Sequence, residues 1–157
     1  MREIHIPWVK PIPSKKALIA FVMILLGFFL IASRFFSDVD RGNTKSVQIG
    51  NDVYVLEIAD TDALRKKGLG GRDSLCETCG MLFVFEQPDR YAFWMKDMRF
   101  PLTLIWLAGD RVVFVARDIS PDFSSVIDPP ASADRVIEIN ADRAVDLNPG
   151  DQVRFFP

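Results

Sequence analysis

The chain has 157 residues, with 19 Lys and Arg against 21 Asp and Glu, two Cys and one His. This length allows one domain beside a targeting segment. The acidic balance excludes a typical nucleic-acid binder, which needs clustered Lys and Arg to neutralise phosphates, so we expect no nucleic-acid partner.

An uncharged apolar segment runs from residue 17 to residue 33 near the N-terminus. Extended to residue 36, it reaches the roughly 20 residues that cross a bilayer. Residues 1–37 carry five basic residues and one acidic residue, so the positive-inside rule places the N-terminus in the cytoplasm. We therefore expect a retained signal anchor. The alternative is a cleaved signal peptide that leaves a secreted or periplasmic domain, although Ile31-Ala32-Ser33 is a poor cleavage site.

The expected organisation has four parts: a cytosolic tail at 1–16, a transmembrane signal anchor at 17–36, a tether at 37–46 and an extracytoplasmic β domain at 47–157. The single histidine, His5, falls in the cytosolic tail. A Ser-His-Asp centre, a Cys-His centre and a His-ligated metal site are therefore excluded from the outer domain. We expect no metal and no cofactor.

The outer domain is predicted to open with a hairpin, in which Val47–Gly50 and Val53–Ala59 flank a turn at Asn51-Asp52. A short helix is expected next, from Asp62 to Lys67, with Asp60 or Thr61 as its N-cap and Gly68 at its end.

Six further strands are expected because each apolar stretch is bounded by turn residues: Met81–Phe85, Tyr91–Met95, Leu102–Leu107, Arg111–Arg117, Arg135–Ile139 and Gln152–Phe156. The first two of these form a predicted hairpin, turning at Gln87-Pro88-Asp89, whose aromatic side chains fill a core. The longest loop runs from Ser120 to Ala133. This pattern predicts a mainly β domain, a sandwich or jelly-roll-like partly closed barrel with one short helix, preceded by the transmembrane helix.

A set of motifs resembles, in order and spacing, the family known as domain of unknown function 192. They are Glu57, Thr61, Arg65, Gly68-Leu69, Arg72, Gly80-Met81-Leu82-Phe83-Val84-Phe85, Phe93-Trp94-Met95-Lys96, Pro101-Leu102, Val136-Ile137-Glu138 and Pro149-Gly150-Asp151. The resemblance covers roughly Val47 to Phe155 and implies a small β domain, often exported or membrane-anchored, with no established activity. The chain departs from the family pattern at Gly70, where Met is usual, at Asp97-Met98, which replaces Asn-Thr, and at Thr103, where Asp is common.

The two cysteines, Cys76 and Cys79, are two ligands short of a structural zinc site. Outside the cytoplasm, a local disulfide is the expected state. A thioredoxin-like redox centre is the alternative, but it needs the pair at a helix N-terminus, and here the pair precedes a strand.

Candidate binding residues lie in two places. Trp94 and Lys96 alternate with Phe93 and Met95, so they share the strand face away from the core, where an aromatic plane beside a cation can receive a sugar ring or an acidic ligand; Asp97 follows them. A partly buried Trp with a snorkelling Lys is the structural alternative.

The other two candidates are Arg65 and Arg72, which bracket the end of the predicted helix. Either arginine pairs with a strand carboxylate, Glu57 or Glu138, or presents its guanidinium to a ligand, and the sequence leaves both open.

The expected function is a ligand-binding or accessory module of the cell envelope. One alternative is a carboxylate-dependent hydrolase of envelope carbohydrate, for which Glu57, Glu86, Asp97 and Asp118 are available. Another is a protein-interaction module that uses an edge strand or the loop from Ser120 to Ala133. No catalytic residue can be assigned from the sequence.

Overall fold

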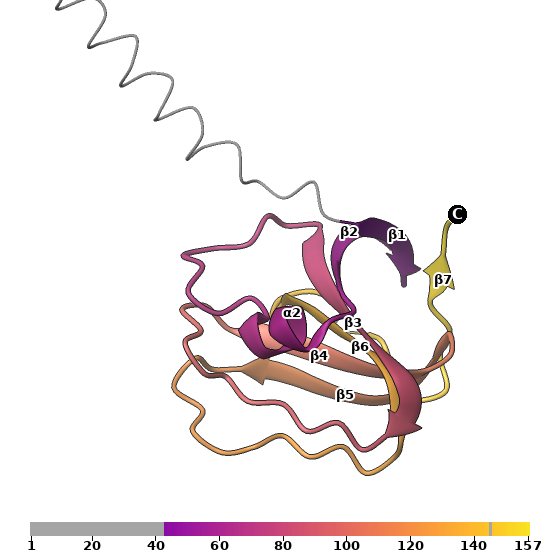
Figure 1. Ribbon diagram of the computed structural model, residues 1–157. Coiled ribbons are helices and arrows are strands. Elements are labelled where there is room, and N and C mark those ends of the chain that lie inside the picture. Colours follow the sequence, from indigo (N-terminus) through magenta and orange to yellow (C-terminus); the bar gives the residue numbers. More distant parts are fainter. Residues whose placement is uncertain (1–42, 145) are drawn as a thin grey trace, which may run out of the picture. The chain divides into compact units, whose positions relative to one another are not determined.

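The structure, a computed structural model, describes residues 43–144 and 146–157, which belong to one compact unit (Figure 1). Its elements in chain order are β1 (Thr44–Ile49), β2 (Asp52–Ala59), α2 (Asp62–Lys67), β3 (Cys79–Asp89), β4 (Leu102–Ala108), β5 (Arg111–Ile119), β6 (Ala133–Asn140) and β7 (Arg154–Phe155). The predicted tail and membrane anchor lie outside the described residues. Within the described ranges, the structure contains no helix with the length and apolar content of a membrane span.

All seven strands belong to one sheet in the order β5-β4-β6-β3-β2-β1-β7, which curls into a half-barrel (Figure 1). A bridge between Arg111 and Gln152 ties the segment before β7 back to β5. The N–H of Val112 also donates to the carbonyl of Asp151 at 2.8 Å. The predicted mainly β, partly closed barrel with one short helix is therefore confirmed, whereas a two-sheet sandwich or jelly roll is wrong.

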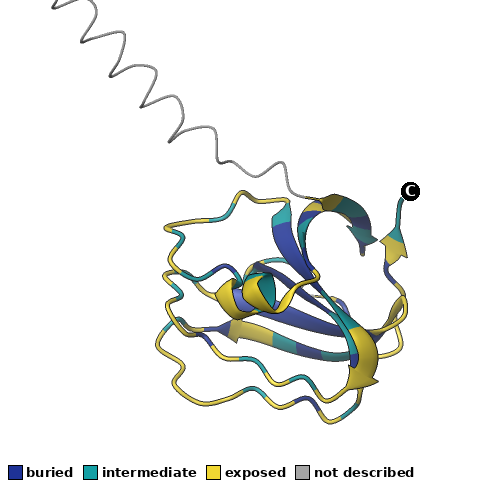
Figure 2. Ribbon diagram, in the orientation of Figure 1, coloured by how far each residue is buried: buried dark blue, intermediate teal, exposed yellow. Residues whose placement is uncertain are grey.

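The central strands of the sheet are buried on both faces (Figure 2). One apolar cluster includes Leu56, Ile105 and Ile137, and a second includes Phe83 and Trp106. Strand β4 contributes to both clusters, because its side chains alternate between the two faces and six of its seven residues are buried. The second cluster is the one that carries the candidate site.

The domain opens with the predicted hairpin, although its bounds differ from the prediction. Strands β1 and β2 form an antiparallel hairpin in which Ile49 pairs with Asp52, so Gly50 and Asn51 are the turn residues, one position earlier than expected. Gly50 has a φ of 59°, which glycine adopts without strain. Strand β1 itself begins at Thr44, inside the segment expected to be a tether.

The predicted hairpin at Gln87-Pro88-Asp89 is wrong, because β3 continues through this stretch as far as Asp89. The register of β3 on β6 shifts after Val84. Such an irregularity accommodates Pro88, which has no N–H to donate to a ladder.

The strand predicted from Tyr91 to Met95 is also absent from the structure, where only Phe93 pairs, through a bridge with Ile127. The aromatic side chains nevertheless meet, since the rings of Phe85 and Tyr91 stack with centroids 3.5 Å apart. The pairing of these two segments was mispredicted because β3 pairs with strands that are distant from it in the sequence. It lies parallel to β2 on one side and antiparallel to β6 on the other.

Candidate functional site

A groove of about 800 Å³ lies beside α2 on the face of the second apolar cluster. It is lined by residues from three parts of the chain: Arg65, Lys66, Lys67, Gly68, Leu69, Gly70 and Gly71; Phe93, Trp94, Lys96, Asp97, Met98 and Arg99; and Phe83 and Glu138 from the sheet. The groove therefore brings four of the five predicted binding residues together, while Arg72 does not line it.

The helix beside the groove is held by caps at both ends. Thr61 is the N-cap, and its hydroxyl accepts from the N–H of Leu64 at 3.3 Å. Gly68 ends the helix with a φ of 52°, and its N–H donates to the carbonyl of Leu64 at 2.9 Å. These caps fix the direction in which the chain leaves the helix and enters the wall of the groove.

Arg65 anchors this helix to the sheet. One guanidinium nitrogen donates to the carbonyls of both Asp60 and Val84 at 2.8 Å, and the other donates to the carboxylate of Asp62 at 2.7 Å. The guanidinium also lies over the ring of Phe85, 5.4 Å from its centroid. Although Arg65 lines the groove, these guanidinium nitrogens already donate hydrogen bonds to groups of the protein itself.

Arg72 forms a bidentate ion pair with Glu57, with nitrogen–oxygen distances of 2.6 and 2.8 Å. The hydrogen bonds from Arg72 lower the pKa of the Glu57 carboxyl, and the same bonds raise the pKa of the Arg72 guanidinium. Of the two roles left open for Arg72, the structure shows the pairing with a strand carboxylate.

Glu138 is the buried acid of the site. It lies in β6 between the β3 residue Met81 and the β4 residue Leu104, and only 5% of it is exposed. Burial among these apolar neighbours raises the pKa of the Glu138 carboxyl to about 8, although the charge of Arg72 opposes the rise. The carboxyl is consequently neutral at pH 7.

One oxygen of Glu138, Oε2, is buried and has no hydrogen-bond partner among the described residues. The nearest boundary of the groove is Gly68, where an added Cβ would lie 3.8 Å from this oxygen and 3.6 Å from Cζ of Phe83. A side chain at position 68 would therefore be in van der Waals contact with the unpartnered carboxyl oxygen, and glycine leaves only its backbone next to it.

Trp94 and Lys96 lie as the alternation predicted. Phe93 packs edge-on against the ring of Phe83, with centroids 4.9 Å apart, and Met95 is buried. Trp94 is 61% exposed, and Nζ of Lys96 lies 5.9 Å from the centroid of its indole. This arrangement differs from the alternative of a partly buried Trp, because the indole lies on the surface.

Asp97 joins the two walls of the groove. Its φ of 59° is uncommon for a residue with a side chain, and its carbonyl accepts from the N–H of Gly71 at 2.8 Å. Gly70 allows this approach, because a Cβ there would lie 3.2 Å from the carbonyl oxygen of Lys67 and 3.3 Å from that of Lys96.

The cysteines lie away from the groove. Cys76 and Cys79 are joined by a disulfide at the start of β3, and neither lines the groove. In the described ranges, no group of three or more His, Cys, Asp or Glu side chains is placed to hold a metal ion.

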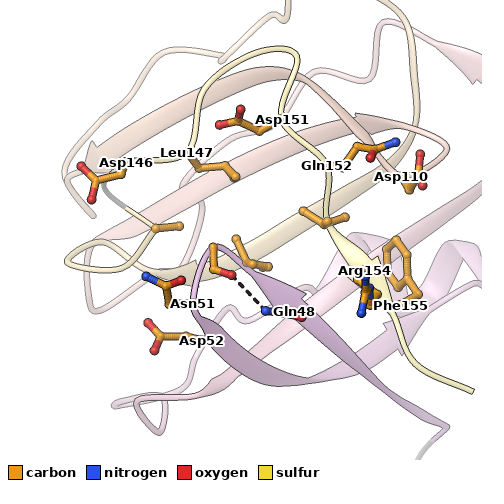
Figure 3. Close-up of a pocket in the computed structure, with 14 residues that line it drawn as sticks. Gln48, Asn51, Asp52, Asp110, Asp146, Leu147, Asp151, Gln152, Arg154 and Phe155 are labelled. Atoms are coloured by element: carbon orange, nitrogen blue, oxygen red, sulfur yellow. Dashed lines mark hydrogen bonds between the residues drawn. The ribbon is translucent and has the colours of Figure 1, made fainter.

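A second hollow, of about 970 Å³, lies between the β1–β2 turn and the segment that leads into β7 (Figure 3). Its charged lining is mostly acidic, with Asp52, Asp110, Asp146 and Asp151, all of them exposed. None of the buried unpartnered polar atoms found in the described residues, on Tyr54, Glu138 and Arg143, belongs to this lining. The groove beside α2 is the stronger candidate for this reason.

The chain matches the model of domain of unknown function 192 (DUF192), described as an uncharacterized ACR, over residues 45–155. It belongs to this family. A comparison with curated proteins finds no match to this DUF192 chain.

Two solved structures resemble this DUF192 domain. One, from Novosphingobium aromaticivorans DSM 12444 and of unknown function, is 30% identical with a TM-score of 0.65; the match covers 74% of this chain and 89% of that one. The other is described as a candidate transcription regulator from Sinorhizobium meliloti 1021 and is 23% identical with a TM-score of 0.67; the match covers 73% of this chain and 95% of that one. The second likeness shows the fold alone.

The departures from the DUF192 pattern have structural counterparts in this chain. Gly70 allows the groove walls to approach each other, and Met98 lines the groove beside Asp97. Thr103 is fully buried, and its hydroxyl donates to the carbonyl of Ala141 at 3.0 Å. Thr103 therefore holds the end of β6 and does not line the groove.

Sequence reasoning named Glu138 only as a possible partner for an arginine. A carboxylate inside the apolar run Val136-Ile137-Glu138-Ile139 was the available signal, because ionisable residues are rarely fully buried without a partner. The signal was weak because alternate residues of many strands face solvent, so a carboxylate in a strand is not unusual in itself. Glu138 is covered only by the packing of the helix and loops, which the sequence does not show.

Proposed function

We propose that this DUF192 domain is a ligand-binding module of the cell envelope whose groove binds a small anionic molecule. The observation that carries the proposal is the buried Oε2 of Glu138, which has no hydrogen-bond partner among the described residues and lies next to Gly68 in the lining of the groove. Leaving a buried polar group unsatisfied costs about 1–3 kcal/mol. A ligand atom that bonds to this carboxyl would remove that cost.

The charge around the groove supports an anionic ligand. Lys66, Lys67 and Lys96 line it, and none of the three is ion-paired within the described ranges. Because the Glu138 carboxyl is neutral at pH 7, it does not offset these charges. The groove is cationic even though residues 38–157 carry 14 Lys and Arg against 20 Asp and Glu, a net charge of −6. That negative net charge argues against nucleic acid as the anion.

Thermal unfolding of the full chain in the presence of acetate, inorganic phosphate, sulfate, glucuronate and glucose tests the proposal. A ligand at 100 times its dissociation constant adds about 2.7 kcal/mol of stability, which raises the melting temperature by roughly 10 °C at about 4 °C per kcal/mol in a domain of this size. At least one of the anions is expected to give this shift, and Lys96→Ala is expected to abolish it.

Lys45→Ala is the matched control, because Lys45 lies on β1 and does not line the groove. This variant should keep the full ligand-induced shift. If no anion changes the melting temperature, or if both lysine variants lose the shift equally, the anion-binding function is wrong.

A hydrolase remains the second candidate, and one observation favours it. Of the four carboxylates that the sequence offered, only Asp97 lines the groove, where it accompanies the neutral carboxyl of Glu138. A protonated acid and a second carboxylate are the groups that glycoside hydrolysis requires. Release of reducing sugar from envelope polysaccharide, lost in both Asp97→Asn and Glu138→Gln, would support this function, and no release by the unmodified chain would rule it out.

The location outside the cytoplasm is part of the same proposal. It is supported by the apolar run at 17–36 and by the net charge of +4 in residues 1–37. N-terminal sequencing of the mature protein is expected to begin at or next to Met1. A mature N-terminus near Arg34 would show that the segment is a cleaved signal peptide instead.

A further inference from the structure

The groove presents an aromatic surface that the rest of the fold does not use. Trp94 is 61% exposed, while the other described tryptophan, Trp106, is fully buried. The backbone beside Trp94 is held in place, because Phe93 and Ile127 exchange two hydrogen bonds of 3.0 and 2.8 Å. An exposed indole on a hydrogen-bonded backbone is a platform on which a flat apolar face can stack, and a Trp side chain loses little entropy when it is immobilised.

A cation lies beside this platform. The Lys96 ammonium is 5.9 Å from the centroid of the indole, and it forms no ion pair within the described ranges. A molecule stacked on Trp94 can therefore place a negative substituent at its rim against Lys96. An exposed indole with a lysine ammonium group nearby suits a ligand that has both an apolar face and an anionic group.

The third recognition group, Glu138, can bond to a hydroxyl group of the ligand in either of its protonation states. A protonated carboxyl donates one hydrogen bond and accepts others, whereas a carboxylate only accepts. A hydroxyl group, which both donates and accepts, satisfies Glu138 in either protonation state. Phosphate and sulfate oxygens act mainly as acceptors, so they match only the protonated state and are repelled by the ionised one.

We propose, on the basis of the anion-binding function above, that the ligand is an acidic sugar such as a hexuronic acid residue. Its ring stacks on Trp94, its carboxylate lies against Lys96, and one of its hydroxyl groups bonds to the buried Oε2 of Glu138. Gly68, which lacks a side chain, lies next to this oxygen at the groove.

Isothermal titration calorimetry of the full chain with glucuronate, glucose and inorganic phosphate tests this assignment. Glucuronate is expected to bind at least about tenfold more tightly than either of the other two, which corresponds to about 1.4 kcal/mol. Trp94→Ala should weaken glucuronate about tenfold and leave phosphate unchanged, and Lys96→Ala should reduce glucuronate to the affinity of glucose. Binding of glucuronate to the unmodified chain should also quench the exposed indole, and Trp94→Ala should lose this quenching.

Phe123→Ala is the matched control, since Phe123 is another exposed aromatic residue, at 43%, and does not line the groove. It should bind glucuronate as the unmodified chain does. If phosphate binds as tightly as glucuronate and Trp94→Ala changes neither, the sugar assignment is wrong while the anion-binding function stands. If glucose binds as tightly as glucuronate, or if no anion binds, both are wrong.

Discussion

The hollow beside the β1–β2 turn and the groove beside α2 differ in how their acidic side chains are solvated. Asp52, Asp110 and Asp151 line the larger hollow (Figure 3) and are exposed to water. The carboxylate of Asp151 accepts from the backbone N–H of Asn148 at 2.7 Å. In the smaller groove, Glu138 is buried and one of its oxygens has no hydrogen-bond partner in the part of the chain that the structure describes. Volume alone would favour the larger hollow, but exposed carboxylates cost the fold little. A desolvated, unsatisfied carboxyl has a cost that selection for stability alone would remove.

The largest effect is expected from Glu138→Gln, measured as the pH dependence of the free energy of unfolding. The Glu138 carboxyl keeps its proton up to about pH 8 in the folded chain and loses it near its ordinary pKa of 4.5 in the unfolded chain. Unfolding between these values releases a proton, so rising pH destabilises the unmodified chain. Relative to Glu138→Gln, its stability should fall by up to about 1.4 kcal/mol per pH unit in this range.

Denaturant titrations at pH 5, 6 and 7 measure this slope. Below pH 4.5 the two chains should differ by a constant amount, because Glu138 is then protonated in both states. Parallel stability curves from pH 5 to pH 7 would show that Glu138 titrates normally, and the contrast between the two hollows would then disappear.

A smaller effect, about 1 kcal/mol within a range of 0.5–2, is expected from Thr61→Ala. This substitution removes the side-chain oxygen that accepts from the N–H of Leu64 and caps α2, the helix that forms one wall of the groove. The loss should appear in urea unfolding and should be accompanied by weaker ligand binding at the groove. Unchanged stability would show that Arg65 holds the helix without the cap.

Glu57→Gln should lower the free energy of unfolding by less than about 1 kcal/mol, because the Arg72–Glu57 pair is partly exposed. The pH dependence of this effect should be opposite in sign to that of Glu138→Gln. Arg72 lowers the pKa of Glu57, so the pair stabilises the fold above the ordinary pKa of 4.5, and this contribution disappears as pH falls below it. The stability difference between the two chains, measured by urea unfolding from pH 7 to pH 3, should therefore shrink toward low pH.

The same variant also tests the titration of Glu138, because it leaves Arg72 without its carboxylate partner. Arg72 already favours the ionised form of Glu138, and without Glu57 its charge should act on Glu138 more strongly. The pH slope assigned to Glu138 should then become shallower. An unchanged slope would show that Glu138 and the ion pair titrate independently.

Local signals account for the parts of the fold that could be predicted from the sequence. The helix from Asp62 to Lys67 has the predicted bounds, with Thr61 and Gly68 as caps, because both ends depend on neighbouring residues. The failed hairpin at residues 87–89 shows the limit of such signals. Pro88 marks a turn in most local contexts, yet here the irregular pairing of β3 with β6, more than 40 residues later, keeps it in a strand.

The candidate site likewise has features that local sequence predicts and features that depend on tertiary packing. The placement of Trp94 and Lys96 outside the core could be predicted, because alternation along an extended segment is local. The importance of Glu138 could not, since its burial depends on α2, on the loop after it and on Leu69 packing over the sheet. A carboxylate in a strand becomes unusual only when tertiary packing excludes water from it.

The smallest effect is expected in the larger hollow, where Asp110→Asn should change the free energy of unfolding by no more than about 0.5 kcal/mol. Asp110 is exposed, and its structural contribution is a backbone carbonyl that accepts from the N–H of Val153 at 2.9 Å, which the substitution keeps. Binding at the groove beside α2 should also be unchanged, as calorimetry with the ligand of the groove can measure. A loss of ligand affinity in Asp110→Asn would place the functional site in the larger hollow, and the buried carboxyl of Glu138 would then not be the ligand-binding group.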